Sequence, residues 1–209
     1  MAATCKFNST DKNEWSKSIY FDSKSGKTYI HYTIKIKVVN AGVLSKEEAT
    51  EIMDETKNQI KKSFSLIDKK NKTVYTTEMQ YSFEDADNIV DNDFYIEFQD
   101  RKNASPFGNV RMGLTKEIGN TEKNKIEISV KHNGEKLPLK KIVTSLCHEI
   151  GHTVGLTHPK NAGFFSWIAF KMGFWDNNLM NQNIDKNQGK KLKLSQLKKI
   201  DATIKKMNG

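Results

Sequence analysis

The residues best suited to chemistry lie between positions 148 and 158, where the sequence is HEIGHTVGLTH. Three of the chain's five histidines, His148, His152 and His158, fall in this segment, and Glu149 directly follows the first. Neutral imidazoles bind zinc, and a carboxylate beside them can accept a proton from water. Three unrelated surface histidines would rarely match this spacing by chance. The segment therefore predicts a metal site with a base beside it.

The spacing also predicts how a helix would present these residues. His148 and His152 would lie within about 40° of each other. The apolar residues of the predicted helix recur on nearly the opposite side, at positions 139, 142, 143, 146, 150 and 154. The histidines should therefore face away from the core and into an open cleft. Gly155 can adopt a positive φ, break the helix and bring His158 back to the same point. Three imidazoles with an open fourth position are typical of catalytic zinc, and Glu149 is the candidate general base acting on metal-activated water.

This extended motif resembles that of the metzincin zinc metalloendopeptidases, which also have a methionine-containing turn beneath the metal. The segment Asn178-Leu179-Met180-Asn181 resembles that turn, which makes Met180 the candidate methionine. The resemblance implies a zinc-dependent endopeptidase that hydrolyses peptide bonds in extended polypeptides. It also places an edge strand for substrate at the upper rim of the cleft (Val110, Arg111, Met112, Gly113 and Leu114).

Within the metzincins, the chain is most similar to matrixin and serralysin catalytic modules. Ala86-Asp87, Tyr95–Phe98 and Leu194-Ser195 are similar to matrixin segments, whereas His158-Pro159 is more like the serralysins. Gln182 stands where serralysins have a tyrosine ligand, so that ligand is not carried over.

The patterns around the motif predict an α+β fold. Alternating apolar residues indicate five strands, near 29–38, 74–83, 93–98, 110–115 and 125–131. Ser45 and Glu48 form a capping-box pattern at the start of a long helix, a second helix precedes Gly155, and a last one begins near Ser195. We expect a metzincin-like fold: a mixed, twisted five-stranded sheet with two long helices in the upper lobe, and a small lower lobe with the Met turn and C-terminal helix. Residues 1–17 should form a flexible tail, and 18–209 a single catalytic domain with subdomains at about 18–157 and 158–209.

Composition narrows the choice of partners. The 209 residues carry a net charge of +9, but only Arg101 and Arg111 are arginines, so lysines spread along the chain supply the charge. Nucleic-acid recognition relies on arginine forks and clustered patches, so we expect no nucleic-acid partner. We also expect no transmembrane segment, a monomer, and a secreted or cell-envelope (periplasmic) location with any signal peptide absent from this chain.

Two weaker hypotheses accompany this interpretation. The acidic segment from Glu84 to Asp93 could hold Ca²⁺, although its spacing fits no defined calcium loop. The alternative function is a non-catalytic zinc-containing module that binds a peptide or protein. Such a module needs the metal ligands but not a base, so Glu149 favours the enzyme.

Overall fold

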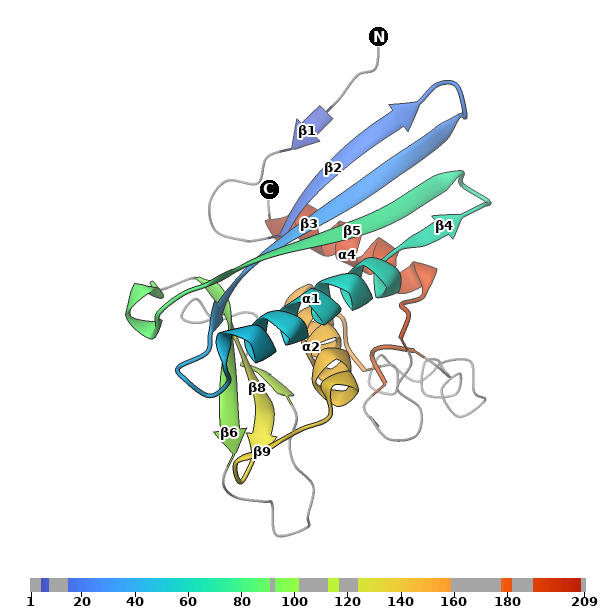
Figure 1. Ribbon diagram of the computed structural model, residues 1–209. Helices are drawn as coiled ribbons and strands as arrows, with labels where there is room; N and C mark the ends of the chain where they lie inside the picture. Colours follow the sequence, from blue (N-terminus) through green and yellow to red (C-terminus); the bar gives the residue numbers. More distant parts are fainter. Residues whose placement is uncertain are drawn as a thin grey trace. The chain divides into compact units, whose positions relative to one another are not determined.

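The computed structural model describes residues 5–7, 15–90, 93–101, 113–116, 124–158, 178–181 and 190–207. They form an α+β fold with a mixed sheet, as the sequence predicts (Figure 1). The chain groups into two compact units that interleave along the sequence, a first (Met1–Lys35, Ile60–Gln80 and Val154–Gly209) and a second (Ile36–Gln59 and Tyr81–Thr153). The continuous subdomains at 18–157 and 158–209 remain a prediction.

The first unit contains antiparallel strand pairs and the C-terminal helix. Strand β2 pairs antiparallel with β3 from Trp15↔Ile34 to Asp22↔Lys27, and β4 pairs antiparallel with β5. Helix α4 buries Leu197, Ile200 and Ile204 on one face. The elements of this unit, two of which continue into the second, are β1 (Cys5–Phe7), β2 (Trp15–Asp22), β3 (Lys27–Val39), β4 (Leu66–Asp68), β5 (Thr73–Phe83) and α4 (Leu194–Met207).

The second unit contains the parallel strands and the helix with the histidines. The end of β3 runs parallel to β6, and β6 runs parallel to β8. Strand β7 pairs antiparallel with β8, and the Asn133-Gly134 turn, with φ of 51° and 83°, leads from β8 into β9. The elements of this unit are η1 (Ala86–Asn88), β6 (Phe94–Arg101), β7 (Gly113–Lys116), β8 (Asn124–His132), β9 (Glu135–Lys136), α2 (Leu139–Thr153) and most of α1 (Lys46–Ser63).

Helix α1 begins at a capping box and packs against α2. The predicted capping box of α1 is confirmed, because the backbone N–H of Glu48 donates to Ser45 Oγ and that of Ser45 to Glu48 Oε2, each at 3.1 Å. This donation by Ser45 holds the pKa of Glu48 below its usual value. Helices α1 and α2 meet where Cys147 Sγ lies 3.9 Å from the carbonyl oxygen of Thr56. Cys147 is fully buried, which raises the pKa of its thiol.

The expected strand count was wrong. The five predicted strands correspond to β3, β5, β6, β7 and β8, but the described residues form nine strands. The largest omission is β2, which begins at Trp15, inside the segment that we expected to be a flexible tail. Trp15 is buried, and its ring centroid lies 6.2 Å from that of Phe64. Apolar and polar residues do not alternate regularly along β2, so the hydrophobic pattern of the sequence did not predict this strand.

A buried ion pair fixes α4 to β2. Lys17 Nζ lies 2.6 Å from Asp201 Oδ1, with side-chain exposures of 7% and 21%. Removing one partner leaves a charge with little water around it, so we expect Lys17→Met to lower the free energy of unfolding by about 2 kcal/mol. Denaturant unfolding would test this, with the exposed Lys24→Met as the matched control. Equal stability of the two variants would contradict a stabilising role for the pair.

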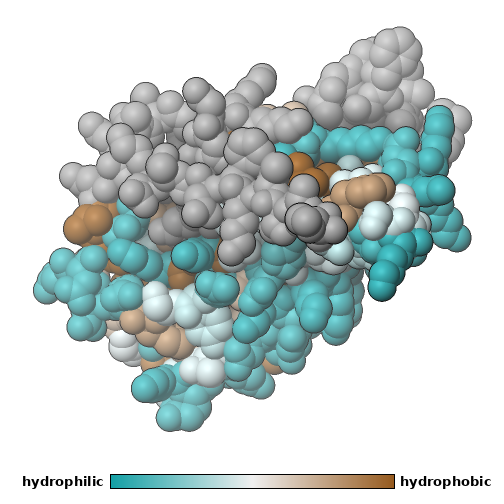
Figure 2. Space-filling view, turned by 90° about the horizontal axis from the view of Figure 1, so that it is seen from above, coloured by the Kyte–Doolittle hydropathy of each residue, from teal (hydrophilic) through white to brown (hydrophobic). Residues whose placement is uncertain are grey.

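One face of the described chain is largely hydrophilic (Figure 2). Figure 2 shows mainly hydrophilic residues, with smaller hydrophobic areas between them, on the part of this face that belongs to the described chain. None of the helices in the described ranges is long and apolar enough to cross a membrane.

Candidate metal centre

Helix α2 carries the first two histidines on the side opposite its apolar face. Ile142, Leu146 and Ile150 are fully buried on that face, and the helix contacts β7 and β8. His148 is 7% exposed, whereas His152 is partly exposed. The expectation that both histidines face open space is therefore wrong for His148, which is enclosed. A buried imidazole retains a fixed orientation better than an exposed one, which suits a ligand.

The two rings direct nitrogen atoms at each other. Nε2 of His152 lies 3.1 Å from Nε2 of His148, and the rings are inclined at 85° with centroids 4.7 Å apart. The four-residue spacing on α2 produces this approach, since it places the side chains on successive turns. Two neutral imidazoles with converging lone pairs form a natural pair of ligands for one cation.

The third histidine follows a break in the helix. Helix α2 ends at Thr153, and Gly155 has φ of 73°, in the left-handed region that favours glycine. One ligand nitrogen from each of His148, His152 and His158 then lies within 4.8 Å of the other two. Tetrahedral zinc with Zn–N bonds of about 2.1 Å requires nitrogens about 3.4 Å apart. Three imidazole nitrogens are the ligands of many catalytic zinc sites, so the donor set fits zinc.

Glu149 lies one position round the helix from His148 and is partly exposed. Its carboxylate is not one of the grouped donor atoms. A general base needs this arrangement, because it must reach a water molecule without occupying a ligand position.

Met180 lies in a turn held by buried amide groups that sequence reasoning missed. Met180 is fully buried, and its backbone N–H donates to Asn178 Oδ1 at 2.9 Å. Asn178 Nδ2 donates to Gln196 Oε1 at 2.7 Å, and Gln196 Nε2 donates back to Asn178 Oδ1 at 3.2 Å. One sequence signal could have pointed to Gln196, which stands at the third position of α4, where capping boxes have Glu or Gln. Its Oε1 accepts a hydrogen bond from the N–H of Lys193 at 2.9 Å, which is one half of such a box.

The predicted substrate strand is described in part. Val110, Arg111 and Met112 lie outside the described residues, whereas Gly113 and Leu114 begin β7. Within the described ranges β7 pairs with β8 alone and stands last in the strand order.

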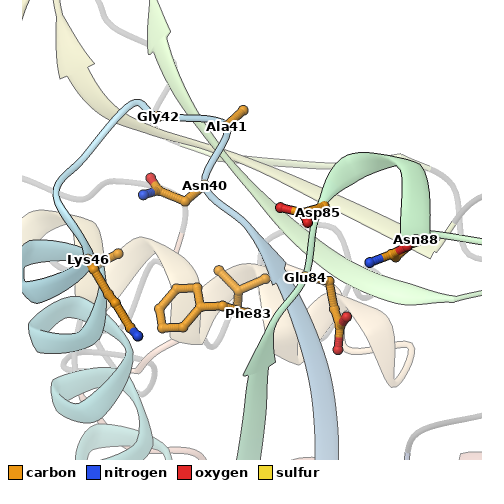
Figure 3. Close-up of a pocket in the computed structure, with 10 residues that line it drawn as sticks. Asn40, Ala41, Gly42, Lys46, Phe83, Glu84, Asp85 and Asn88 are labelled. Atoms are coloured by element: carbon orange, nitrogen blue, oxygen red, sulfur yellow. The ribbon is translucent and has the colours of Figure 1, made fainter.

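A separate pocket of about 370 Å³ lies within the second unit, and it is lined by none of the predicted zinc ligands, by neither Glu149 nor Met180, and by none of the predicted substrate strand (Figure 3). It is bounded by the turn at Ala41 and Gly42, by Lys46 at the start of α1, and by residues that follow β5. Among the latter are Glu84 and Asp85, the first residues of the acidic segment considered for Ca²⁺.

The described residues do not support calcium binding in that segment. Glu84 Oε1 accepts the hydroxyl of Ser82 at 3.0 Å, and Asp93 Oδ2 lies 2.7 Å from Lys37 Nζ. The histidine triad is the one group of three or more metal-ligating side chains found among the described residues. Calcium binding needs the negative charge of carboxylates such as that of Asp93, and Lys37 already compensates that charge.

A mixed α+β fold with three convergent imidazoles and an adjacent carboxylate defines a candidate metal-dependent hydrolase. The chain belongs to Peptidase family M54, a family of zinc metallopeptidases, whose model matches residues 3–178. This match contains the whole histidine motif, and Met180 and α4 lie beyond it. The match supports a zinc metallopeptidase but does not support the expected similarity to matrixins and serralysins, which rested on short segments such as Tyr95–Phe98 and His158-Pro159.

Several solved structures are similar to the chain, and one of them is a metalloproteinase. The crystal structure of metalloproteinase-II from Bacteroides fragilis matches with a TM-score of 0.43 and 13% sequence identity. The match covers 82% of this chain and 53% of that one, so the chain spans about half the length of that protein. A comparison with curated proteins gives no match.

Proposed function

We propose that this metallopeptidase is a zinc-dependent endopeptidase that cleaves internal bonds of extended polypeptides, with Glu149 as general base. The observation that carries the proposal is the convergence of three histidine nitrogens within 4.8 Å, with Glu149 adjacent to the buried His148. We also propose that the motif and the Met180 turn make the chain metzincin-like.

Each residue would have a distinct role. His148, His152 and His158 would hold Zn²⁺, which when bound supplies a Lewis acid that polarises the scissile carbonyl and lowers the pKa of water. Glu149 would accept a proton at a carboxylate oxygen as water attacks the carbonyl carbon. The same carboxyl group would return that proton to the leaving amine, so no covalent intermediate with the protein is needed.

The runner-up is a zinc-containing module that binds peptides without cleaving them. It would use the same three histidines but would have no need of Glu149. An acidic residue at this position of the zinc helix therefore supports the enzyme over the binding module.

Substrate specificity for internal bonds can be tested directly. We expect cleavage of unstructured peptides that are acetylated at the N-terminus and amidated at the C-terminus, analysed by mass spectrometry with and without a zinc chelator. A requirement for a free terminus would instead indicate an exopeptidase. Zinc binding without any cleavage across a diverse library would favour the binding module.

Strand β7 is the proposed platform for substrate. A strand that pairs on one side offers backbone N–H and C=O groups on the other, and an extended peptide can satisfy them whatever its side chains. Because this addition requires an extended peptide, we expect poor cleavage of helical substrates.

Gly113→Pro should weaken substrate binding by deleting one backbone donor and crowding β7. We expect a higher KM or a lower kcat/KM, by roughly tenfold, with zinc still bound. Gly113→Ala is the matched control, because it keeps the N–H. Unchanged kinetics in a folded Gly113→Pro variant would contradict the edge-strand proposal.

A further inference from the structure

Helix α4 contacts several segments of the first unit at specific polar groups. Its Asp201 pairs with Lys17 of β2, and the carbonyl oxygen of Leu197 lies 3.5 Å from the Tyr32 hydroxyl of β3. Two further residues of α4, Gln196 and Thr203, lie beside segments that belong to the candidate site. These two residues are seven positions apart, so they lie on one face of α4 about two turns, or roughly 10 Å, from each other.

The contact at Gln196 is a closed amide pair. Asn178 and Gln196 are 1% and 7% exposed and exchange two hydrogen bonds, of 2.7 and 3.2 Å. Each amide oxygen also accepts a backbone N–H, from Met180 at 2.9 Å and from Lys193 at 2.9 Å. These bonds fix the orientation of both amides and join the Met180 turn to the first turn of α4. A buried network in which the members satisfy one another is rigid, and breaking it leaves desolvated polar groups.

Thr203 lies beside the helix break at Gly155. A Cβ built on Gly155 would lie 3.6 Å from Thr203 Oγ1 and 3.8 Å from its Cγ2. Gly155 is the residue with positive φ three positions before His158. One face of α4 therefore lies beside the turn that leads to His158 and is hydrogen-bonded to the turn that contains Met180.

We propose that Asn178 and Gln196 are positioning residues of the metal centre, through which α4 holds the Met180 turn in place relative to the His158 segment. This inference rests on the proposed function, in which His158 is a zinc ligand and Met180 lies beneath the metal. In this proposal neither amide touches the metal or the substrate, because their polar atoms are engaged with each other and with the backbone. Their effect is to limit the positions that the turn can adopt, and residues that support a metal site in this way commonly affect affinity by tenfold to a hundredfold.

The test compares two buried substitutions of similar size. Gln196→Met keeps the volume of the side chain and removes the amide, whereas Thr77→Val removes a different buried hydrogen bond of the first unit, from Thr77 Oγ1 to the carbonyl oxygen of Phe64 at 2.9 Å. Zinc affinity is measured by competition with a chelator, and the geometry of the site from the visible absorption spectrum of the Co²⁺-substituted protein.

We expect Gln196→Met to lower zinc affinity by roughly tenfold or more and to change the Co²⁺ spectrum. Thr77→Val should change neither, even if both variants lose similar stability. Equal affinities and an unchanged spectrum in folded Gln196→Met would overturn the proposal, as would equal losses in the two variants.

A milder variant covers the case in which Gln196→Met does not fold. Asn178→Ser keeps an uncharged side-chain oxygen that can accept the N–H of Met180 and removes the amide that donates to Gln196 Oε1. We expect a smaller loss of affinity, of about threefold, with a detectable change in the Co²⁺ spectrum; an unchanged spectrum and affinity would overturn the positioning role. Failure of the wild-type protein to bind zinc would instead refute the proposed function, so the two failures are distinguishable.

Discussion

Replacing Glu149 with alanine should leave about one zinc bound per chain and lower peptidase activity by a factor on the order of 10² to 10⁴. The expected effect is selective because the substitution removes the base and retains the three imidazoles. Glu149 is not among the grouped donor atoms, so the ligand set should be unaffected. Zinc content by elemental analysis and kcat/KM with a blocked peptide would be measured on the same preparation.

The matched control is Glu135→Ala, which removes an exposed carboxylate from β9. It should retain wild-type zinc content and activity. Wild-type rates in Glu149→Ala would show that another group accepts the proton, and loss of zinc from that variant would indicate that Glu149 contributes to the metal site itself.

Replacing His158 with alanine should weaken zinc binding by a factor on the order of 10² or more. The variant loses one of the three imidazole ligands and keeps only two. His158 is reached only after the break at Gly155, so this variant tests whether the turn returns the chain to the metal. Chelator competition would measure the affinity.

His31→Ala provides the comparison for a histidine outside the motif. His31 lies in β3, and its Nδ1 is 2.9 Å from Oγ1 of Thr76 in β5. It is not one of the three histidines whose nitrogens converge. The variant should bind zinc as the wild-type protein does. Unaltered affinity in His158→Ala would place the third ligand elsewhere in the chain.

The sequence was most informative where local rules decide the structure. The four-residue spacing of His148 and His152 on a helix predicts their convergence, and Gly155 supplies a backbone conformation that other residues adopt at a cost. The capping box of Ser45 and Glu48 likewise depends only on residues close in sequence, and the structure confirms it.

Features that depend on distant partners were not predicted. Strand β2 exists because Trp15 packs near Phe64 and Lys17 pairs with Asp201, and neither partner can be recognised from the pattern of residues 15–22 alone. The amide pair of Asn178 and Gln196 spans 18 positions. Single polar residues carry no periodic signal, so such a pair becomes visible only when the fold brings its members together.

The peptidase family was harder to predict from short motifs than the metal site was. The histidine segment correctly indicated a zinc metallopeptidase, but the other segments compared with matrixins and serralysins are short, and one of them belongs to an ordinary buried strand. Tyr95–Phe98 lies in β6, where apolar residues alternate because one face of the strand is buried. Such a pattern follows from burial in many sheets, so it does not distinguish one peptidase family from another.

Titration of the metal-free protein with Zn²⁺, with peptide cleavage measured at each addition, tests the central claim most directly. If His148, His152 and His158 bind one catalytic zinc, cleavage of a doubly blocked peptide should rise linearly and stop rising at one equivalent. Cleavage that is independent of added zinc, or zinc binding at one equivalent with no cleavage, would contradict the assignment of this chain as a zinc-dependent endopeptidase.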